Sequence, residues 1–89
     1  CAKGKIQINE GAYRALLSSQ AASLLPVGVV AVEGQFEKDD IVQILAPDGS
    51  AFALGKISCS AEEVQSRMGL QGERPFVHYN NLYMEWRTE

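Results

Sequence analysis

The sequence predicts a small mixed α/β fold, mainly β, in which a barrel-like sheet of short strands is plugged by two helices. Three observations support this prediction. Short apolar segments with strand patterning follow one another along the chain, separated by turn residues. Two segments carry the capping residues that begin helices. The chain has 89 residues, which suffices for a single domain (1–89), and strands this short need closure of the sheet to protect their edges.

The first strand and the first helix are predicted from adjoining residues. Residues 5–8 alternate between polar and apolar side chains, which is the period of a half-buried strand. Asn9 is a good helix cap, and a helix over 10–20 follows it. Ile8 and Tyr13 occupy the two positions of a hydrophobic staple. The side chains expected on the buried stripe of this helix are Tyr13, Leu16 and Leu17.

Segment 23–34, with the sequence SLLPVGVVAVEG, is the element around which the rest is expected to be organised. It turns at Pro26 and Gly28 and then runs through four consecutive apolar residues, 29–32. Valine is stiff at its first side-chain torsion and suits a pleated surface. We therefore expect a buried strand with a shaped entry loop. The apolar stretch is far shorter than the roughly 20 residues that cross a bilayer, so no membrane partner is expected.

A hairpin is predicted in the middle of the chain. Residues 35–40 are polar apart from Phe36 and are expected to form a loop. Strand 41–45 leads into the turn 46–49, which has proline second and glycine fourth, the pattern of a type I turn. Segment 51–57 then returns as the partner strand.

A second, short helix is predicted from Ser60, because Glu63 follows at capping-box spacing and Gly69 suits a left-handed C-cap. The remainder is expected to form a loop at 71–75 and strand segments at 76–79 and 82–86, joined by a tight turn or a bulge at 80–81.

Composition narrows the classes of function. Eight basic and eleven acidic side chains give a formal charge of -3, the opposite of the balance expected when phosphate contacts supply the affinity. Cys1 and Cys59 are the only cysteines, which favours a reducing cytoplasm over a disulfide framework. The chain begins with Cys1 and not with methionine, so we expect a piece of a longer protein.

The sequence 55–58 resembles the end of a phosphate-binding loop, which consists of a glycine, a lysine and a hydroxyl residue, because it contains Gly55, Lys56 and Ser58. The pattern fails twice, because Ser50 stands where the first glycine is required and Ile57 stands where the magnesium-binding hydroxyl is required. A hairpin strand with an exposed lysine is the preferred interpretation.

The other reactive side chains have structural interpretations as well. His78 is the only histidine, and no metal-ligand partner is placed near it in sequence. Cys59 lacks a flanking base and is expected to fill the core. The adjacent acids at 39–40 and 62–63 cannot face one another across a catalytic site, so capping and loop roles account for them. We therefore expect no catalytic residue, no metal site and no cofactor in this domain.

Basic residues offer one alternative. Lys3 and Lys5 lie on one face of the first strand, and Arg14 follows one turn into the first helix. These three side chains could form a small basic patch that contacts nucleic acid.

Several motifs, taken together, resemble a known family. They are Gly11-Ala12, segment 23–29, the residues Val32-Glu33-Gly34-Gln35-Phe36, Asp40-Ile41-Val42, Pro47-Asp48-Gly49, Gly55, the helix start at 60–63, Val77-His78 and Asn81-Leu82. Over nearly the whole chain these residues are similar to the PUA family, in the branch found at the C-terminus of bacterial glutamate 5-kinases.

The resemblance implies a pseudo-barrel of about six short strands with two short helices, attached to an amino-acid-kinase domain that this chain lacks. That kinase domain would bind ATP, Mg and glutamate and carry out the first step of proline synthesis in the cytoplasm, within an enzyme expected to be a homo-oligomer. The present domain would then be a non-catalytic accessory domain for regulation, assembly or partner contacts, with the kinase domain of the same chain as its partner.

The competing hypothesis is a PUA module that binds structured RNA. The resemblance implies a surface made by the first helix, the loop into the second strand and the end of the chain. The candidate residues for an RNA or partner surface are Lys3, Lys5, Arg14, Ser23, Leu24, Pro26 and Gly28.

Three departures from the family pattern bear on that choice. Asp39 stands where the family usually has glycine, Leu54 where it often has a basic residue, and Tyr79 where it commonly has arginine. Two positive charges are therefore missing, which disfavours RNA binding.

Overall fold

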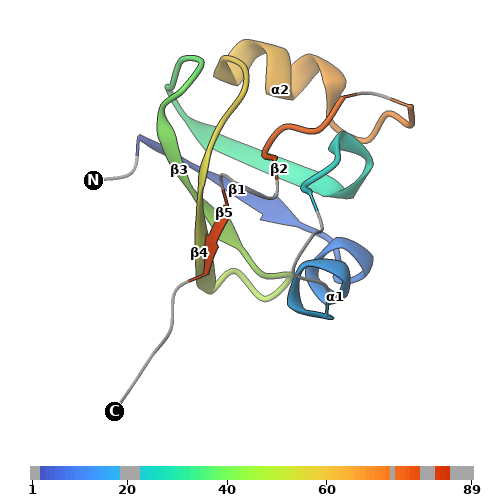
Figure 1. Cartoon of the computed structure of the whole chain (residues 1–89). Coiled ribbons are helices and arrows are strands. Elements are labelled where there is room, and N and C mark those ends of the chain that lie inside the picture. Colours follow the sequence, from blue (N-terminus) through green and yellow to red (C-terminus); the bar gives the residue numbers. More distant parts are fainter. Residues whose placement is uncertain (1–2, 19–22, 73, 79–81, 85–89) are drawn as a thin grey trace.

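The computed structural model describes residues 3–18, 23–72, 74–78 and 82–84, and Figure 1 traces their path. The described residues form one five-stranded sheet in the order β2-β1-β3-β4-β5, with two α-helices and a 3-10 turn. The elements are β1 (Gly4–Ile8), α1 (Glu10–Ser18), η1 (Pro26–Gly28), β2 (Val29–Gly34), β3 (Ile41–Leu45), β4 (Ala51–Lys56), α2 (Ala61–Arg67) and β5 (Leu82–Met84). The predicted mainly β class with two short helices is confirmed.

Strand β1 lies inside the sheet, antiparallel to β2 and parallel to β3. Its alternation follows the prediction, because Ile6 and Ile8 are completely buried in the core while Lys5 is exposed. Gln7 points to the outer face, where its side-chain amide donates to the carbonyl of Pro47 at 2.9 Å. The same strand therefore supplies the centre of the core and a tether for the β3–β4 turn.

The β3–β4 hairpin is confirmed, with β4 ending one residue before the predicted limit. The N–H of Gly49 donates to the carbonyl of Ala46 at 2.8 Å and closes the turn. Asp48 Oδ1 accepts from the N–H of Ser50 at 3.0 Å and from its hydroxyl at 2.8 Å. These two bonds, the backbone bond first, hold the pKa of the Asp48 carboxyl below its ordinary value.

The strand predicted at 29–32 is present as the start of β2, after the predicted entry loop, but the expectation that it is buried is wrong. Only Val29 is buried, at 3% exposure, whereas Val30 is 54% exposed. The reason is that β2 lies at the edge of the sheet and carries a bulge, since Ile8 pairs with Val29 while Gln7 pairs with Ala31. Helix α2 lies beside β2 and covers part of this edge (Figure 1).

The predicted stripe of α1 is correct in part. Leu16 is buried and Tyr13 packs against the core, where its ring meets Phe52 edge-to-face with centroids 4.8 Å apart. Leu17 was expected on the same stripe but is 53% exposed. The helix directs Ala12 and Leu16 toward the core. Leu17 lies about 100° further round the helix axis than Leu16, so its side chain points away from the core.

Helix α2 begins as predicted, and the glycine predicted to close it is left-handed, although its N–H donates to the carbonyl of Pro26 and not to the helix. The Ser60 hydroxyl accepts from the N–H of Glu63, whose carboxylate accepts from the N–H of Ser60, both at 3.4 Å. Gly69 follows the helix with a positive φ of 84°. Val64 faces inward and is completely buried, and the Arg67 guanidinium lies 5.3 Å from the centre of the Phe76 ring.

The last segments differ from the prediction. Residues 76–78 form no strand, only an isolated antiparallel bridge between Leu24 and Val77. Toward residue 75 the pairing ends because Pro26 turns the partner segment into η1 two residues after Leu24, and residue 79 of the predicted strand lies outside the described residues. Strand β5 confirms the core of the predicted segment 82–86, while the turn or bulge expected at 80–81 lies outside the described residues.

We expect Ser60→Ala to lower the free energy of unfolding by about 1 kcal/mol, because it removes the cap of α2. Urea-induced unfolding followed by circular dichroism measures the change. The matched control is Ser66→Ala, a serine inside the same helix where alanine is the better helix former, so no loss is expected. Equal losses in both variants would contradict the capping role.

Candidate interaction surface

The candidate surface is built where the loop 23–28 packs against α1. Asn9 caps α1, its Oδ1 accepting from the N–H of Ala12 at 2.8 Å, and its own N–H donates to the carbonyl of Gly28 at 2.9 Å. A Cβ atom added at Gly28 would lie 2.5 Å from the Cβ of Ala12. Glycine is required here because any side chain would push the loop away from the helix.

Backbone hydrogen bonds fix this loop from several sides. Leu24 donates to Val77 at 2.9 Å and accepts from Phe76 at 2.8 Å. The carbonyl of Pro26 accepts from the N–H of Gly69 at 2.7 Å, which ties the loop to the end of α2. A loop held by α1, by the α2 end and by residues 76–77 presents its side chains in fixed directions.

Burial alternates along the fixed loop. Leu24, Pro26 and Gly28 are buried, whereas Leu25 is 45% exposed and Val27 is 39% exposed. The outward side chains flank a groove of about 260 Å³ beside α1. The lining residues are Asn9, Gly11, Ala12, Ala15, Ser23, Leu25, Val27 and Gly28. None of them carries a formal charge, so the groove suits apolar or neutral groups.

The predicted basic residues lie elsewhere. Lys3 and Lys5 line a second hollow of about 280 Å³ on the outer face of the sheet, together with Glu33. Lys5 and Glu33 are also cross-strand partners, so an acid stands beside this base. Arg14 lines neither hollow, and its Nε lies 2.9 Å from Glu10 Oε2 in an exposed ion pair.

The structure therefore divides the candidate residues that the sequence suggested. Ser23 and Gly28 line the groove, whereas Leu24 and Pro26 are buried and do not line it. The sequence reasoning missed Leu25 and Val27 as the outward side chains. Burial alternates from one residue to the next on either side of Pro26, and this alternation could have identified Leu25 and Val27 as outward. It can be recognised only once Leu24 is known to pair with Val77 and therefore to point inward.

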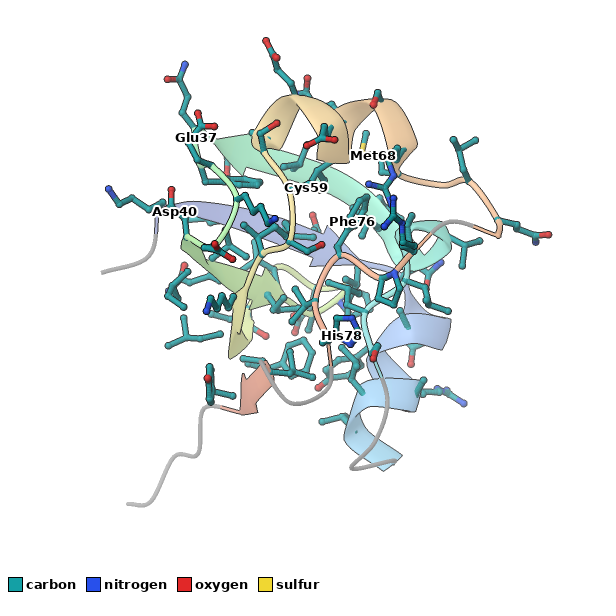
Figure 2. The ribbon with its side chains drawn as sticks, turned by 45° about the horizontal axis from the view of Figure 1, so that its top comes forward. Glu37, Asp40, Cys59, Met68, Phe76 and His78 are labelled. Atoms are coloured by element: carbon teal, nitrogen blue, oxygen red, sulfur yellow. The ribbon has the colours of Figure 1, made fainter. Side chains whose placement is uncertain are left out.

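The positions of Cys59, His78 and Lys56 agree with the structural roles expected for them. Cys59 is buried at 4% exposure, and burial first, then the nearby Glu63 carboxylate, raises the pKa of its thiol. His78 is exposed, and Figure 2 shows it well apart from Cys59, which lies beside α2. Lys56 ends strand β4 and is exposed, so no phosphate loop surrounds it.

Adjacent acids also have structural roles. Asp40 Oδ2 accepts from the N–H of Glu37 at 2.9 Å and closes the turn before β3, where Figure 2 labels both residues. Asp39 in this turn has a φ of 77°, a left-handed conformation that glycine adopts without strain.

Two absences hold for the part of the chain that the structure describes. No three side chains of His, Cys, Asp or Glu come together in a group that could hold a metal ion. None of the helices in the described ranges is both long and apolar enough to span a membrane.

Comparison with known proteins gives consistent matches. Residues 4–75 match the family described as PUA domain. Glutamate 5-kinase of Bacteroides thetaiotaomicron is 49% identical over 84 residues, which cover 94% of this chain and 23% of that protein. The chain thus spans about a quarter of the length of the curated relatives it matches.

Solved structures share the fold. A PUA domain from Aeropyrum pernix K1, solved as a tartrate complex, is similar with a TM-score of 0.76 and 26% identity over 85% of this chain and 41% of that one. The archaeal box H/ACA sRNP Nop10–Cbf5 complex contains a chain with a TM-score of 0.64 and 27% identity, over 88% of this chain and 26% of that one.

We expect Gly28→Ala to lower the free energy of unfolding by about 1–3 kcal/mol, because the new Cβ overlaps Ala12. Chemical denaturation measures the loss. Gly11→Ala is the matched control, since its added Cβ would find only Asn9 Oδ1 at 3.7 Å and it would gain helix propensity. Combining Gly28→Ala with Ala12→Gly should cost less than the sum of the single changes, and strict additivity would refute the contact.

Proposed function

Because this chain belongs to the PUA domain family, we propose that it is the non-catalytic accessory domain of a glutamate 5-kinase, acting in regulation, assembly or partner contacts. The observation that carries the proposal is the 49% identity that extends over 94% of the chain to part of a glutamate 5-kinase. Its partner is the kinase domain of the same chain, in a cytoplasmic enzyme that assembles as a homo-oligomer.

The chemistry belongs to the kinase domain, which would bind ATP, Mg and glutamate. The described residues of this domain do not fit ATP or Mg. Gly55 and Lys56 lie in strand β4 and not in a phosphate-binding loop, and the described acidic side chains form no group for a cation. No step of phosphoryl transfer is therefore assigned to this chain.

RNA binding is the second candidate, supported by the similarity to a chain of the Nop10–Cbf5 complex at 27% identity. Two features count against it here. Arg14 is engaged by Glu10, and Glu33 stands beside Lys5, so two of the three candidate cations have an acidic neighbour. The formal charge of -3 adds a general repulsion of phosphate.

We expect the purified 89-residue chain to show no ADP formation above the blank with ATP, Mg²⁺ and glutamate. A coupled spectrophotometric assay measures this rate. His78→Ala and Lys56→Ala are the diagnostic variants, because His78 carries an exposed imidazole and Lys56 belongs to the segment that resembles a phosphate-binding loop. Any ADP formation by the unsubstituted chain would contradict the accessory role. The two variants would then show whether His78 or Lys56 is responsible for it.

We also expect no specific RNA complex with a Kd below about 10 μM at physiological ionic strength, within the range of non-specific association. Three to five phosphate contacts would give a slope of log affinity against log salt of roughly -2 to -4 on looped RNA. Titration with tRNA at two salt concentrations measures both quantities. Tight binding that is lost in the Lys5→Ala, Arg14→Ala double variant would favour the RNA-binding function instead.

A further inference from the structure

Three of the exposed apolar side chains gather around the loop 23–28. Leu25 and Val27 flank the groove beside α1 and are 45% and 39% exposed. Leu70 is 47% exposed, and the hydrogen bond from Gly69 to the carbonyl of Pro26 holds it next to this loop. We call these three side chains and the groove the Leu25 face. Single exposed apolar residues are ordinary, but a rigid group around a groove marks an interaction surface.

The shape of the groove favours a protein partner. Gly11, Ala12 and Ala15 form its α1 side, so small residues leave room for side chains from outside. Its volume of about 260 Å³ is large enough for one or two apolar side chains of a partner. Leu25 and Val27, which flank the groove, would be covered in the same contact, and so would Leu70 on the neighbouring segment.

The side chains that line the groove offer no positive charge to a phosphate group. The lining has no charged side chain, and the closest described cation on α1, Arg14, is paired with Glu10 at 2.9 Å. Two of the exposed lysines, Lys3 and Lys5, line a different hollow. A desolvated apolar contact therefore fits this surface better than a nucleic-acid backbone.

We propose that the Leu25 face is the docking surface for the kinase domain of the same chain, an inference that rests on the proposed function. The relatives match this chain over only 23% of their length, so most of each homologous chain lies outside the match and remains covalently connected to it. A tethered partner acts at an effective concentration in the millimolar range, which allows a small apolar patch to suffice.

Hydroxyl-radical footprinting with mass spectrometry tests the proposal, on the parent chain and on the isolated 89-residue chain. Labelling of Leu25, which is 45% exposed in the isolated chain, should fall severalfold in the parent chain because the core of an interface excludes water, with parallel falls at Val27 and Leu70. Leu17 and Tyr83 are the internal controls, each 53% exposed, and their labelling should not change. Leu17 lies about 200° round α1 from Ala15 of the groove.

A variant of the parent chain provides the second measurement. Leu25→Asp combined with Val27→Asp should restore the labelling of Leu70 to its level in the isolated chain, because buried carboxylates would open the contact. Leu17→Asp is the matched control and should leave Leu70 protected. Both variants change exposed side chains, so the domain itself remains folded.

Each other outcome overturns the docking proposal. These outcomes are equal labelling in both chains, protection of the isolated chain that vanishes on dilution, and protection that requires added RNA. The second would indicate another copy of this domain and the third a nucleic acid. Glutamate-dependent ADP formation by the parent chain is measured separately, so a parent chain without this activity would refute the proposed function while the footprint still decides the docking.

Discussion

The candidate surface depends on the attachment of loop 24–28 through its main chain. The carbonyl groups of Leu24, Pro26 and Gly28 each accept a hydrogen bond from a different part of the fold. Because backbone atoms make these contacts, the loop does not need polar side chains to hold it, and proline and glycine can occupy its buried positions 26 and 28. The side chains of Leu25 and Val27, which lie between the buried positions, remain exposed. An ordered loop with exposed apolar side chains loses little conformational entropy on binding, which favours recognition by a rigid partner.

Sequence patterns anticipated the local elements well. The caps at Asn9 and Ser60 and the turn at Pro47 work through neighbours within four residues, so the sequence contains everything that determines them. The exposure of Val30 and Leu17, by contrast, depends on which strand takes the edge and how α1 rolls on the core. The burial of these side chains is decided by contacts between residues far apart in the sequence, and such contacts cannot be read from the local pattern of a single sequence.

The site was predictable in outline only. Segment 23–28 was identified correctly as a shaped loop, and Ser23 does line the groove. The family resemblance groups the basic residues with this loop, because it implies a surface made by the first helix and the loop into the second strand, but β1 and α1 direct Lys5 and Arg14 to separate places. Asp39 is a position where the structure explains a sequence pattern. Its φ of 77° lies in the left-handed region, which accounts for the glycine that is usual at this position in the family.

The central position of β1 has a consequence for the order of folding. The β3–β4 hairpin closes through a short turn, whereas the pairing of Gly4 with Val42 brings together residues far apart in sequence. The hairpin can therefore form early, and β1 must then close a long loop to dock beside it. On a ribosome, the core of this domain cannot assemble before β3 and β4 have emerged, so Ile6 and Ile8 stay exposed through most of its synthesis and are a natural target for chaperones.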